Sequence, residues 1–172
     1  MQEIHCNRLG CIDPARRLDV LTRVANHDLT IIRHILGTIP ETALSLIRRE
    51  DGLPVSLLAV LGEGPRATVS ASIRHPRHVR TVSLHGTEGA ALLPDAYADH
   101  VLLRDASGEE QIPFQNTMPL HEELREFVEY LEGGPPPRCG LDHAREAAVA
   151  LDALRRADHS TMSTHDAALS GS

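Results

Sequence analysis

The residues best suited to chemistry in this sequence are His27 and Asp28, which lie in its clearest helical pattern, residues 18–36. A histidine can accept or donate a proton near neutral pH because its pKa is about 6.5. His27 is therefore a candidate general acid or base, and Asp28 beside it is the second candidate catalytic residue. An alternative stays open, in which the pair only caps and packs the helix.

Cationic side chains on the same helix indicate a second kind of site. Arg23 precedes His27 by one helical turn, and Arg33 and His34 follow it. With His27, these side chains could surround a carboxylate or phosphate, because arginine offers two parallel N–H donors. We expect Arg23 and His34 to contact a substrate, with a solvated surface position as the alternative for Arg23. Arg33 is expected to be a solvated surface residue.

Several other chemistries have little support. His75 and His78 flank a turn-like Pro-Arg pair without a third ligand, and the chain holds 11 histidines, so we expect no metal site. No GxSxG motif indicates a serine nucleophile. The formal net charge of −7 with scattered arginines, and only four aromatic residues, argue against nucleic-acid binding.

Length and composition indicate a single domain. A chain of 172 residues can bury roughly 70% of its unfolded surface around one core. Its three cysteines form no CxxC pair, which favours reduced thiols. The first residues lack a signal-peptide pattern, and no apolar stretch of about 18 residues occurs. We therefore expect a cytoplasmic protein with no membrane partner.

The hydrophobic periodicity predicts an α+β fold. Glu3 to Arg8 can form a strand, and Gly37 with Pro40 ends the helix of residues 18–36. Residues 41–114 alternate with period two between turn signals such as Asp51-Gly52, which predicts six to eight mostly antiparallel strands. We expect a large, open-faced, mainly antiparallel sheet with helices on one face.

Two helices are predicted to close the domain, each with an apolar row in the core. The first row is Leu120, Leu124, Phe127, Val128 and Leu131, and the second is Ala144, Ala147, Ala148, Leu151 and Leu154. Periodicity is lost near the end, so we expect a domain of residues 1–157 and a tail, residues 158–172, that is disordered or packs on a partner.

Five stretches of the chain share their order and the positions of their turn residues with a known family. They are EIHCNRLG at residues 3–10, HDLTIIRHILGTIP at 27–40, VSLHGTEGAALLPD at 82–95, DHVLLRDASGEEQIPF at 99–114 and PLHEELREFVEYLEGG at 119–134. Together they resemble the C-terminal substrate domain of the Gfo/Idh/MocA family of sugar and polyol dehydrogenases, over roughly residues 3–157. The resemblance implies that family's dihydrodipicolinate-reductase-like fold for this half.

This resemblance implies a substrate pocket at His27-Asp28, with the histidine placed to exchange a proton with a sugar hydroxyl. It also implies an oligomer interface on the open sheet face, and the row Thr68, Ser70 and Ser72 suits a flat, self-complementary surface. We expect a homodimer or homotetramer through this face.

The sequence also departs from the family pattern. The aspartate usual four residues before the histidine is Arg23 here, and the aspartate usual three residues after it is Thr30. No GxGxxG turn occurs, and no lysine occurs among the 17 basic residues, so we expect neither a dinucleotide site nor the family's catalytic lysine within these residues. We expect no bound cofactor and no autonomous NAD(P) oxidoreductase activity.

Three functions fit these features. The first is a substrate-binding and oligomerisation subunit for a sugar-like or polyol-like molecule, working with a separate Rossmann-domain partner. The second is a cofactor-independent isomerase, lyase or cyclase that uses His27 as acid or base. The third is a non-catalytic scaffold or ligand sensor, which a buried and fully bonded His27 would favour.

Overall fold

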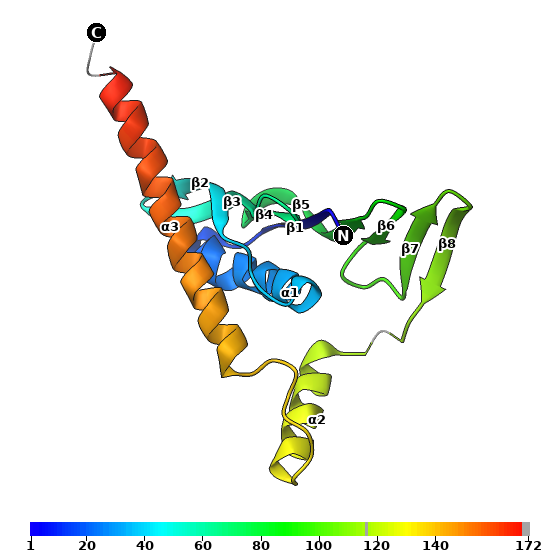
Figure 1. Ribbon diagram of the computed structural model, residues 1–172. Helices are drawn as coiled ribbons and strands as arrows, with labels where there is room; N and C mark the ends of the chain where they lie inside the picture. The colour runs from blue at the N-terminus through cyan, green and yellow to red at the C-terminus, as the bar shows by residue number, and fades with distance from the viewer. Residues whose placement is uncertain (116, 170–172) are drawn as a thin grey trace.

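The computed structural model describes residues 1–115 and 117–169, and the side chains of these residues except 14, 119 and 159–169. Figure 1 shows one large sheet with helices below it and a long C-terminal helix that crosses one edge of the sheet and rises above it. Its elements in chain order are β1 (Glu3–Cys11), a 3-10 turn (Pro14–Arg16), a π-helical segment (Leu21–Ala25), α1 (Asn26–Leu36), β2 (Thr42–Glu50), β3 (Leu53–Leu61), β4 (Arg66–Ser72), β5 (Arg74–His85), β6 (Gly89–Leu93), β7 (His100–Asp105), β8 (Gly108–Pro113), α2 (Pro119–Leu131) and α3 (Leu141–Leu169).

The predicted sheet is confirmed, with eight strands in the order β2-β3-β4-β1-β5-β6-β7-β8. Only β1 and β4 pair in parallel, and the other neighbours are antiparallel. The turn between β2 and β3 is the one that the Asp51-Gly52 signal predicts, because both residues have positive φ, 49° and 78°. β1 lies in the interior of the sheet, between β4 and β5.

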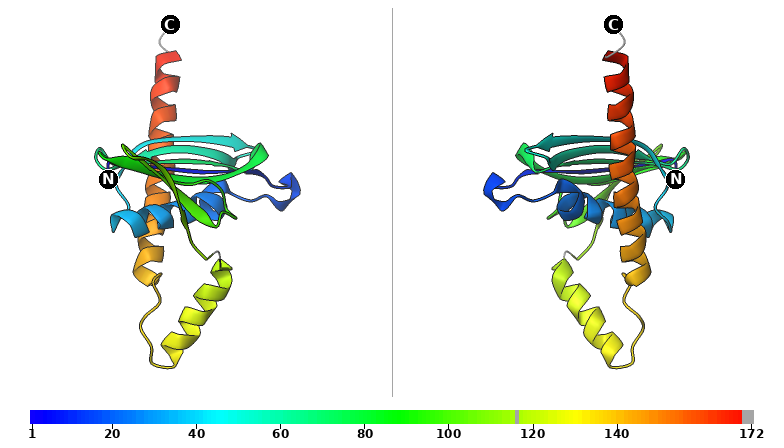
Figure 2. Two further views of the ribbon diagram at one scale, coloured as in Figure 1. Left: turned by 90° about the vertical axis from the view of Figure 1, so that its right-hand side faces the viewer. Right: turned by 90° about the vertical axis from the view of Figure 1, so that its left-hand side faces the viewer.

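One face of the central strands forms the core. Alternate residues of β1, β3 and β4 point to this face and are buried, since successive side chains of a strand point to opposite faces. They pack against α1, the π-helical segment and α3, and the main members of this core are Ile4, Cys6, Leu21, Leu29, Ile32, Val55, Leu57, Ala67, Val69, Leu151 and Leu154. The opposite face carries no helix over these strands (Figure 2).

The helix predicted for residues 18–36 begins later and differently. Its first turns form a π-helix from Leu21, where the Asp19 carboxylate accepts a hydrogen bond from the Leu21 N–H at 2.7 Å. The α-helix proper starts at Asn26 and stops at Gly37, whose φ of 82° confirms the predicted left-handed end.

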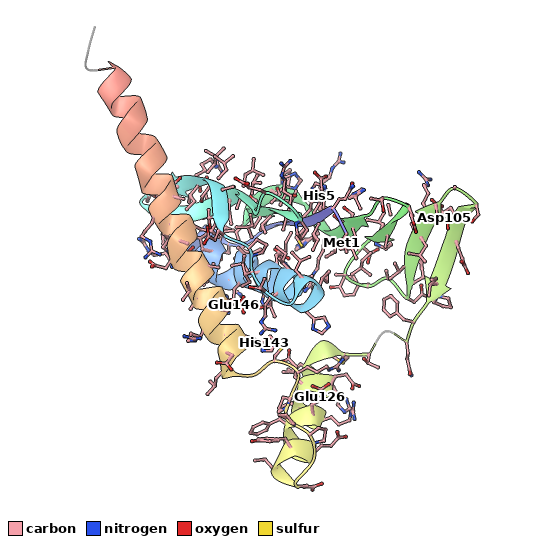
Figure 3. All side chains as sticks on the ribbon, in the orientation of Figure 1. Met1, His5, Asp105, Glu126, His143 and Glu146 are labelled. Atoms are coloured by element: carbon pink, nitrogen blue, oxygen red, sulfur yellow. The ribbon has the colours of Figure 1, made fainter. Side chains whose placement is uncertain are left out.

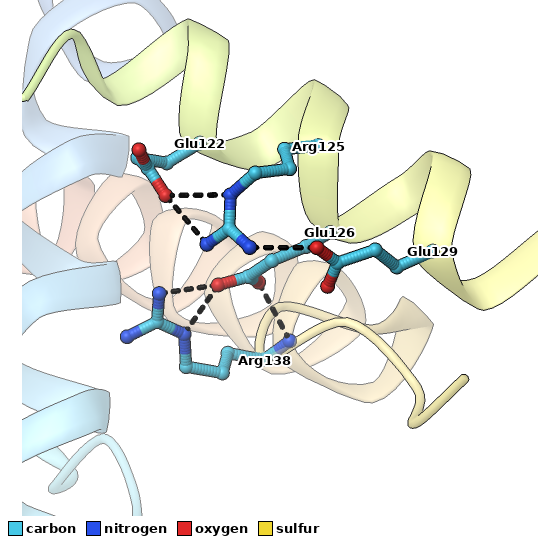
Figure 4. A network of polar contacts seen from close by, with 5 residues as sticks. All are labelled: Glu122, Arg125, Glu126, Glu129 and Arg138. Carbon is cyan, nitrogen blue, oxygen red and sulfur yellow. Dashed lines mark hydrogen bonds and ion pairs between the residues drawn. The ribbon is translucent and has the colours of Figure 1, made fainter.

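The core position predicted for the apolar row of α2 is wrong. Each of these five side chains is at least half exposed, with Leu131 at 67% and Leu120 at 64%. The polar side of the helix is held by ion pairs instead, because Arg125 bridges Glu122 and Glu129 at 2.7 Å each, and Arg138 pairs with Glu126 (Figure 4). Helical periodicity shows that an apolar row exists, but the element that covers it is set by tertiary structure.

The prediction for the last helix is correct in part. Ala147, Leu151 and Leu154 are buried, whereas Ala144 and Ala148 are exposed. The helix passes the β2 edge of the sheet and continues beyond the uncovered face (Figures 1 and 2). The backbone is helical to Leu169, and residues 170–172 lie outside the described part. The domain of residues 1–157 and the tail of residues 158–172 stay predictions.

Two carboxylates fasten α3 to the rest of the fold. Glu146 accepts hydrogen bonds from Arg33 of α1 at 2.9 Å and from the Ile39 N–H at 2.7 Å. Asp158, which is buried, accepts from the Ile47 N–H of β2 at 2.9 Å and pairs with Arg49 at 2.5 Å. The helix is thus held to α1 near its start and to the sheet edge further along.

We expect Asp158→Ala to lower the free energy of unfolding by about 2–3 kcal/mol, because it removes charge-assisted hydrogen bonds from a buried position. Urea denaturation measures this loss. Asp152→Ala is the matched control, since Asp152 lies on the same helix in an exposed pair with Arg156. Its expected cost is below about 0.5 kcal/mol, and equal losses in the two variants would contradict a fastening role for Asp158.

Candidate functional site

His27 and Asp28 point in different directions from the start of α1. Consecutive residues of an α-helix are rotated by about 100° around its axis, so they cannot share a face. Asp28 turns toward the sheet and is only 1% exposed, whereas His27 is exposed. No hydrogen bond of the His27 ring occurs among the described residues, which disagrees with a buried, fully bonded histidine.

Asp28 is held by Arg8, which projects from β1. The Arg8 Nε and Nη2 atoms both lie 2.9 Å from Oδ1 of Asp28, in a pair that is almost completely enclosed. Burial raises the pKa of Asp28, while the hydrogen bond from Arg8 opposes this rise. The second oxygen, Oδ2, is buried without a hydrogen-bond partner among the described residues. The pair therefore compensates the buried charge only in part.

Arg80 lies beside this pair on the next strand. It is directly opposite Arg8 in the antiparallel register of β1 and β5, so both side chains leave the same face of the sheet. Arg80 is exposed, and partial loss of hydration and then the charge of Arg8 lower its pKa, while the charge of Asp28 and the Tyr97 hydroxyl raise it. The guanidinium of Arg80 makes no ion pair or hydrogen bond with any described residue.

The surroundings favour the neutral form of His27. Loss of hydration and then the charge of Arg8 lower its pKa, Asp28 opposes this effect, and Arg80 and Arg23 add smaller contributions in the same direction as Arg8. A neutral imidazole has one lone pair free, so it can accept a proton or a hydrogen bond at neutral pH. The geometry thus suits His27 to act on a hydroxyl group.

The other sequence-predicted residues are not gathered in one place. Arg23 is exposed and near enough to act on His27 through its charge. His34 is exposed about 10 Å further along α1 and lines a groove with α2 and the loop before α3, together with Glu122, Glu123, Glu126, Phe127, Pro137, Arg138 and Cys139. The structure therefore places His34 apart from His27 and Arg8.

Arg33 differs from the solvated residue that we expected. Its Nε donates to Glu146, and its Nη1 lies 2.5 Å from Nε2 of His143. Figure 3 labels these two partners on α3. The contacts with Ile39 and Thr38 and the pairing with Arg33 bring the pKa of Glu146 down to about 2. Arg33 therefore serves the packing of α1 on α3.

Sequence reasoning missed Arg8 and Arg80. A signal for both was present, because each continues an alternating apolar row of its strand: Arg8 follows Ile4 and Cys6, and Arg80 precedes Val82 and Leu84. A charged residue in such a row needs a partner or a ligand when the row is buried. Only the register of the strands shows that the two arginines are neighbours.

Two further classes of site were searched for in the described part of the chain. No group of three histidine, cysteine, aspartate or glutamate side chains there is arranged to hold a metal ion. No helix of that part is long and apolar enough to cross a membrane.

Comparisons by sequence find neither a protein-family model nor a curated protein that matches this chain. Comparison of structures finds UDP-N-acetylglucosamine 3-dehydrogenase GnnA from Acidithiobacillus ferrooxidans, with a TM-score of 0.80 and 18% identity over 91% of this chain and 52% of that one. It also finds KijD10, a 3-ketoreductase from Actinomadura kijaniata solved with TDP-benzene and NADP, with a TM-score of 0.76 and 16% identity over 90% of this chain and 51% of that one.

These neighbours are Gfo/Idh/MocA-type oxidoreductases, and the chain spans about half of their length. At such low identity the likeness shows the fold. The resemblance to the C-terminal domain of that family is therefore confirmed at the level of the fold.

We expect His27 to titrate below the ordinary histidine pKa of about 6.5, and Arg80→Gln to move this pKa upward because a nearby positive charge is removed. The proton NMR signal of the imidazole carbon, assigned with a His27→Gln variant, reports both values. His27 thus contributes stability above about pH 6.5 that is lost as the pH falls through its lowered pKa.

Arg77→Gln removes the same charge from β5 at an exposed position and is the control for this titration. It should leave the pKa of His27 unchanged. An equal response to the loss of Arg77 and of Arg80 would show that only the net charge of the protein matters.

Proposed function

We propose that this chain is the substrate-binding and oligomerisation part of a sugar or polyol oxidoreductase and works with a separate dinucleotide-binding partner. The observation that carries the proposal is the fold match, which covers nearly all of this chain and about half of each neighbour. The neighbours named above include a nucleotide-sugar dehydrogenase and a ketoreductase solved with NADP. The substrate of this chain is accordingly a sugar-like or polyol-like molecule.

The arrangement around His27 supports a substrate site. The imidazole is exposed and favoured in its neutral form, beside the arginines of two central strands. Sugar hydroxyls can both donate to a neutral imidazole and accept from an arginine. Asp28 supports the site indirectly, because it holds Arg8 in place.

The exposed apolar row of α2 supports a separate partner domain. Leu120, Leu124, Phe127, Val128 and Leu131 lie on one helix outside the core of this chain. A contiguous exposed apolar surface commonly marks a protein–protein interface. The neighbours contain about as much further chain as the part matched here, and we assign this row to contact with the dinucleotide-binding domain.

The uncovered sheet face supports self-association. Leu46 and Leu58 stand 47% and 45% exposed there, next to the small residues Ser56, Ser70 and Ser72 across β3 and β4. A flat face of small and apolar side chains can pack against its own copy around a two-fold axis. A homodimer or homotetramer would cover it.

A second candidate function is a cofactor-independent isomerase, lyase or cyclase with His27 as acid or base. The specific observation in its favour is the exposed ring with a lowered pKa, which suits proton transfer near neutral pH. Turnover of a substrate without nicotinamide distinguishes this enzyme from the binding subunit. His27→Ala should then lower turnover by about 10²- to 10⁴-fold.

Calorimetric titration tests the main proposal. NAD and NADP should show no saturable binding to this chain alone, because the sequence has no glycine turn facing a helix N-terminus. A sugar or polyol from a panel should bind, and His27→Ala should weaken it. A saturable micromolar site for either dinucleotide would contradict the proposal that a separate partner binds the dinucleotide.

Light scattering at micromolar concentration should show at least a dimer. Ser70→Arg should weaken the assembly, because it places a charge in the middle of the uncovered face. Thr22→Arg is the control, since Thr22 is exposed on the helix side of the molecule. A monomeric parent protein, or equal weakening by both variants, would exclude assembly through this face.

A further inference from the structure

Arg8 and Arg80 form an unusual pair in the middle of the sheet. They stand directly opposite each other on β1 and β5, where like charges repel and destabilise the strand pair. Arg80 is exposed, and partial loss of hydration and then the charge of Arg8 lower its pKa. Water or an anionic ligand can therefore offset the repulsion at Arg80.

Asp28 offsets only part of the repulsion between Arg8 and Arg80. Its carboxylate is almost fully buried, and Arg8 directs both of its contacts to the same oxygen, Oδ1. Arg80 has no hydrogen bond or ion pair among the described residues. One carboxylate thus faces two guanidinium groups, which leaves an excess of one positive charge and a set of unused N–H donors on Arg80.

The groups around Arg80 are suited to a hydroxylated ligand. His27 is near enough to respond to the charge of Arg80, and its neutral ring can accept a hydrogen bond from a hydroxyl. Tyr97, on the loop between β6 and β7, also acts on Arg80 and is exposed. Donors for an anion and an acceptor for a hydroxyl therefore lie together.

We infer that Arg80, supported by Arg8, binds the carboxylate or phosphate group of a hydroxylated, sugar-like substrate whose hydroxyl contacts His27. This inference rests on the proposed function and narrows its substrate class from sugars and polyols in general to anionic ones. Arginine is the side chain best matched to such groups, because its planar donors meet two oxygens at once.

The other arginines of the region are less suited to this task. Arg33 is occupied by Glu146 and His143. Arg23 lies on the π-helical segment and not on the paired strands, and it contributes less than Arg80 to the lowered pKa of His27. The anion site is therefore built on β1 and β5, at positions that lie far apart in the sequence.

Anions alone provide the first test. Inorganic phosphate and sodium acetate are titrated into the full chain at constant ionic strength set with chloride, and the NMR signal of His27 is followed. Saturable binding that raises the pKa of His27 supports the inference, and the response to acetate or phosphate distinguishes a carboxylate site from a phosphate site. A response no larger than that to chloride overturns the inference.

Variants locate the site. Arg80→Gln should weaken anion binding by about tenfold or more, as expected for the loss of a charge-assisted pair. Arg77→Gln, on the same strand, should leave it unchanged. Because Arg8→Gln would leave Asp28 as a buried unpaired charge, Arg8 is tested together with Asp28→Asn, after a thermal melt shows that the double variant is folded.

Sugars separate this inference from the proposed function. D-glucuronate and D-glucose 6-phosphate are compared with D-glucose by calorimetry, and at least one anionic sugar should bind about tenfold or more tightly than glucose. Equal binding of all three, unchanged in Arg80→Gln, refutes the anion site and leaves the sugar site intact. Anion binding that depends on Arg80, without binding of any sugar in the panel, refutes the proposed sugar site only.

Discussion

The ion pair between Asp28 and Arg8 is the contact on which the candidate site depends. A carboxylate buried beneath a helix costs several kcal/mol unless it is paired, and Arg8 supplies that pair from the central strand. The contact fixes the rotation of α1 against β1, since Asp28 must face the sheet. His27, the preceding residue, is thereby turned outward.

This pair also sets the electrostatics around His27. Arg8 contributes to keeping the ring neutral and repels Arg80 across the strands, while Asp28 opposes its effect on both. In a site built on paired acids, a carboxyl group can donate a proton. This site has excess positive charge and a neutral histidine instead, and it therefore favours anionic ligands. The arginine at position 23 adds to this bias.

The fold leaves two surfaces that its own elements do not cover. The apolar row of α2 lies outside the core, and the sheet face opposite α1 exposes leucines between small residues. The uncovered sheet face follows from a one-sided architecture, in which a sheet buries one face against helices and leaves the other to be covered by another molecule. The α2 row is exposed because this helix lies away from the sheet and its core. The proposed dinucleotide partner and the proposed second copy of the chain would cover one surface each.

Local patterns in the sequence determined the elements of this protein and several of their limits. Alternation predicted the antiparallel strands, Asp51-Gly52 predicted the β2–β3 turn and Gly37 predicted the end of α1, because each depends on backbone preferences of neighbouring residues. The motif order likewise indicated the family fold that the structural comparison confirmed.

Tertiary structure decided which residues meet and which faces are covered. Arg8, Asp28 and Arg80 come from three elements, and strand register and helix rotation bring them together. The exposure of the α2 row was likewise undetermined, since a helical period is the same whether its apolar face meets this core or another molecule. The spacing of residues in the sequence predicts one helix or strand at a time, whereas this site and these surfaces depend on how several elements pack together.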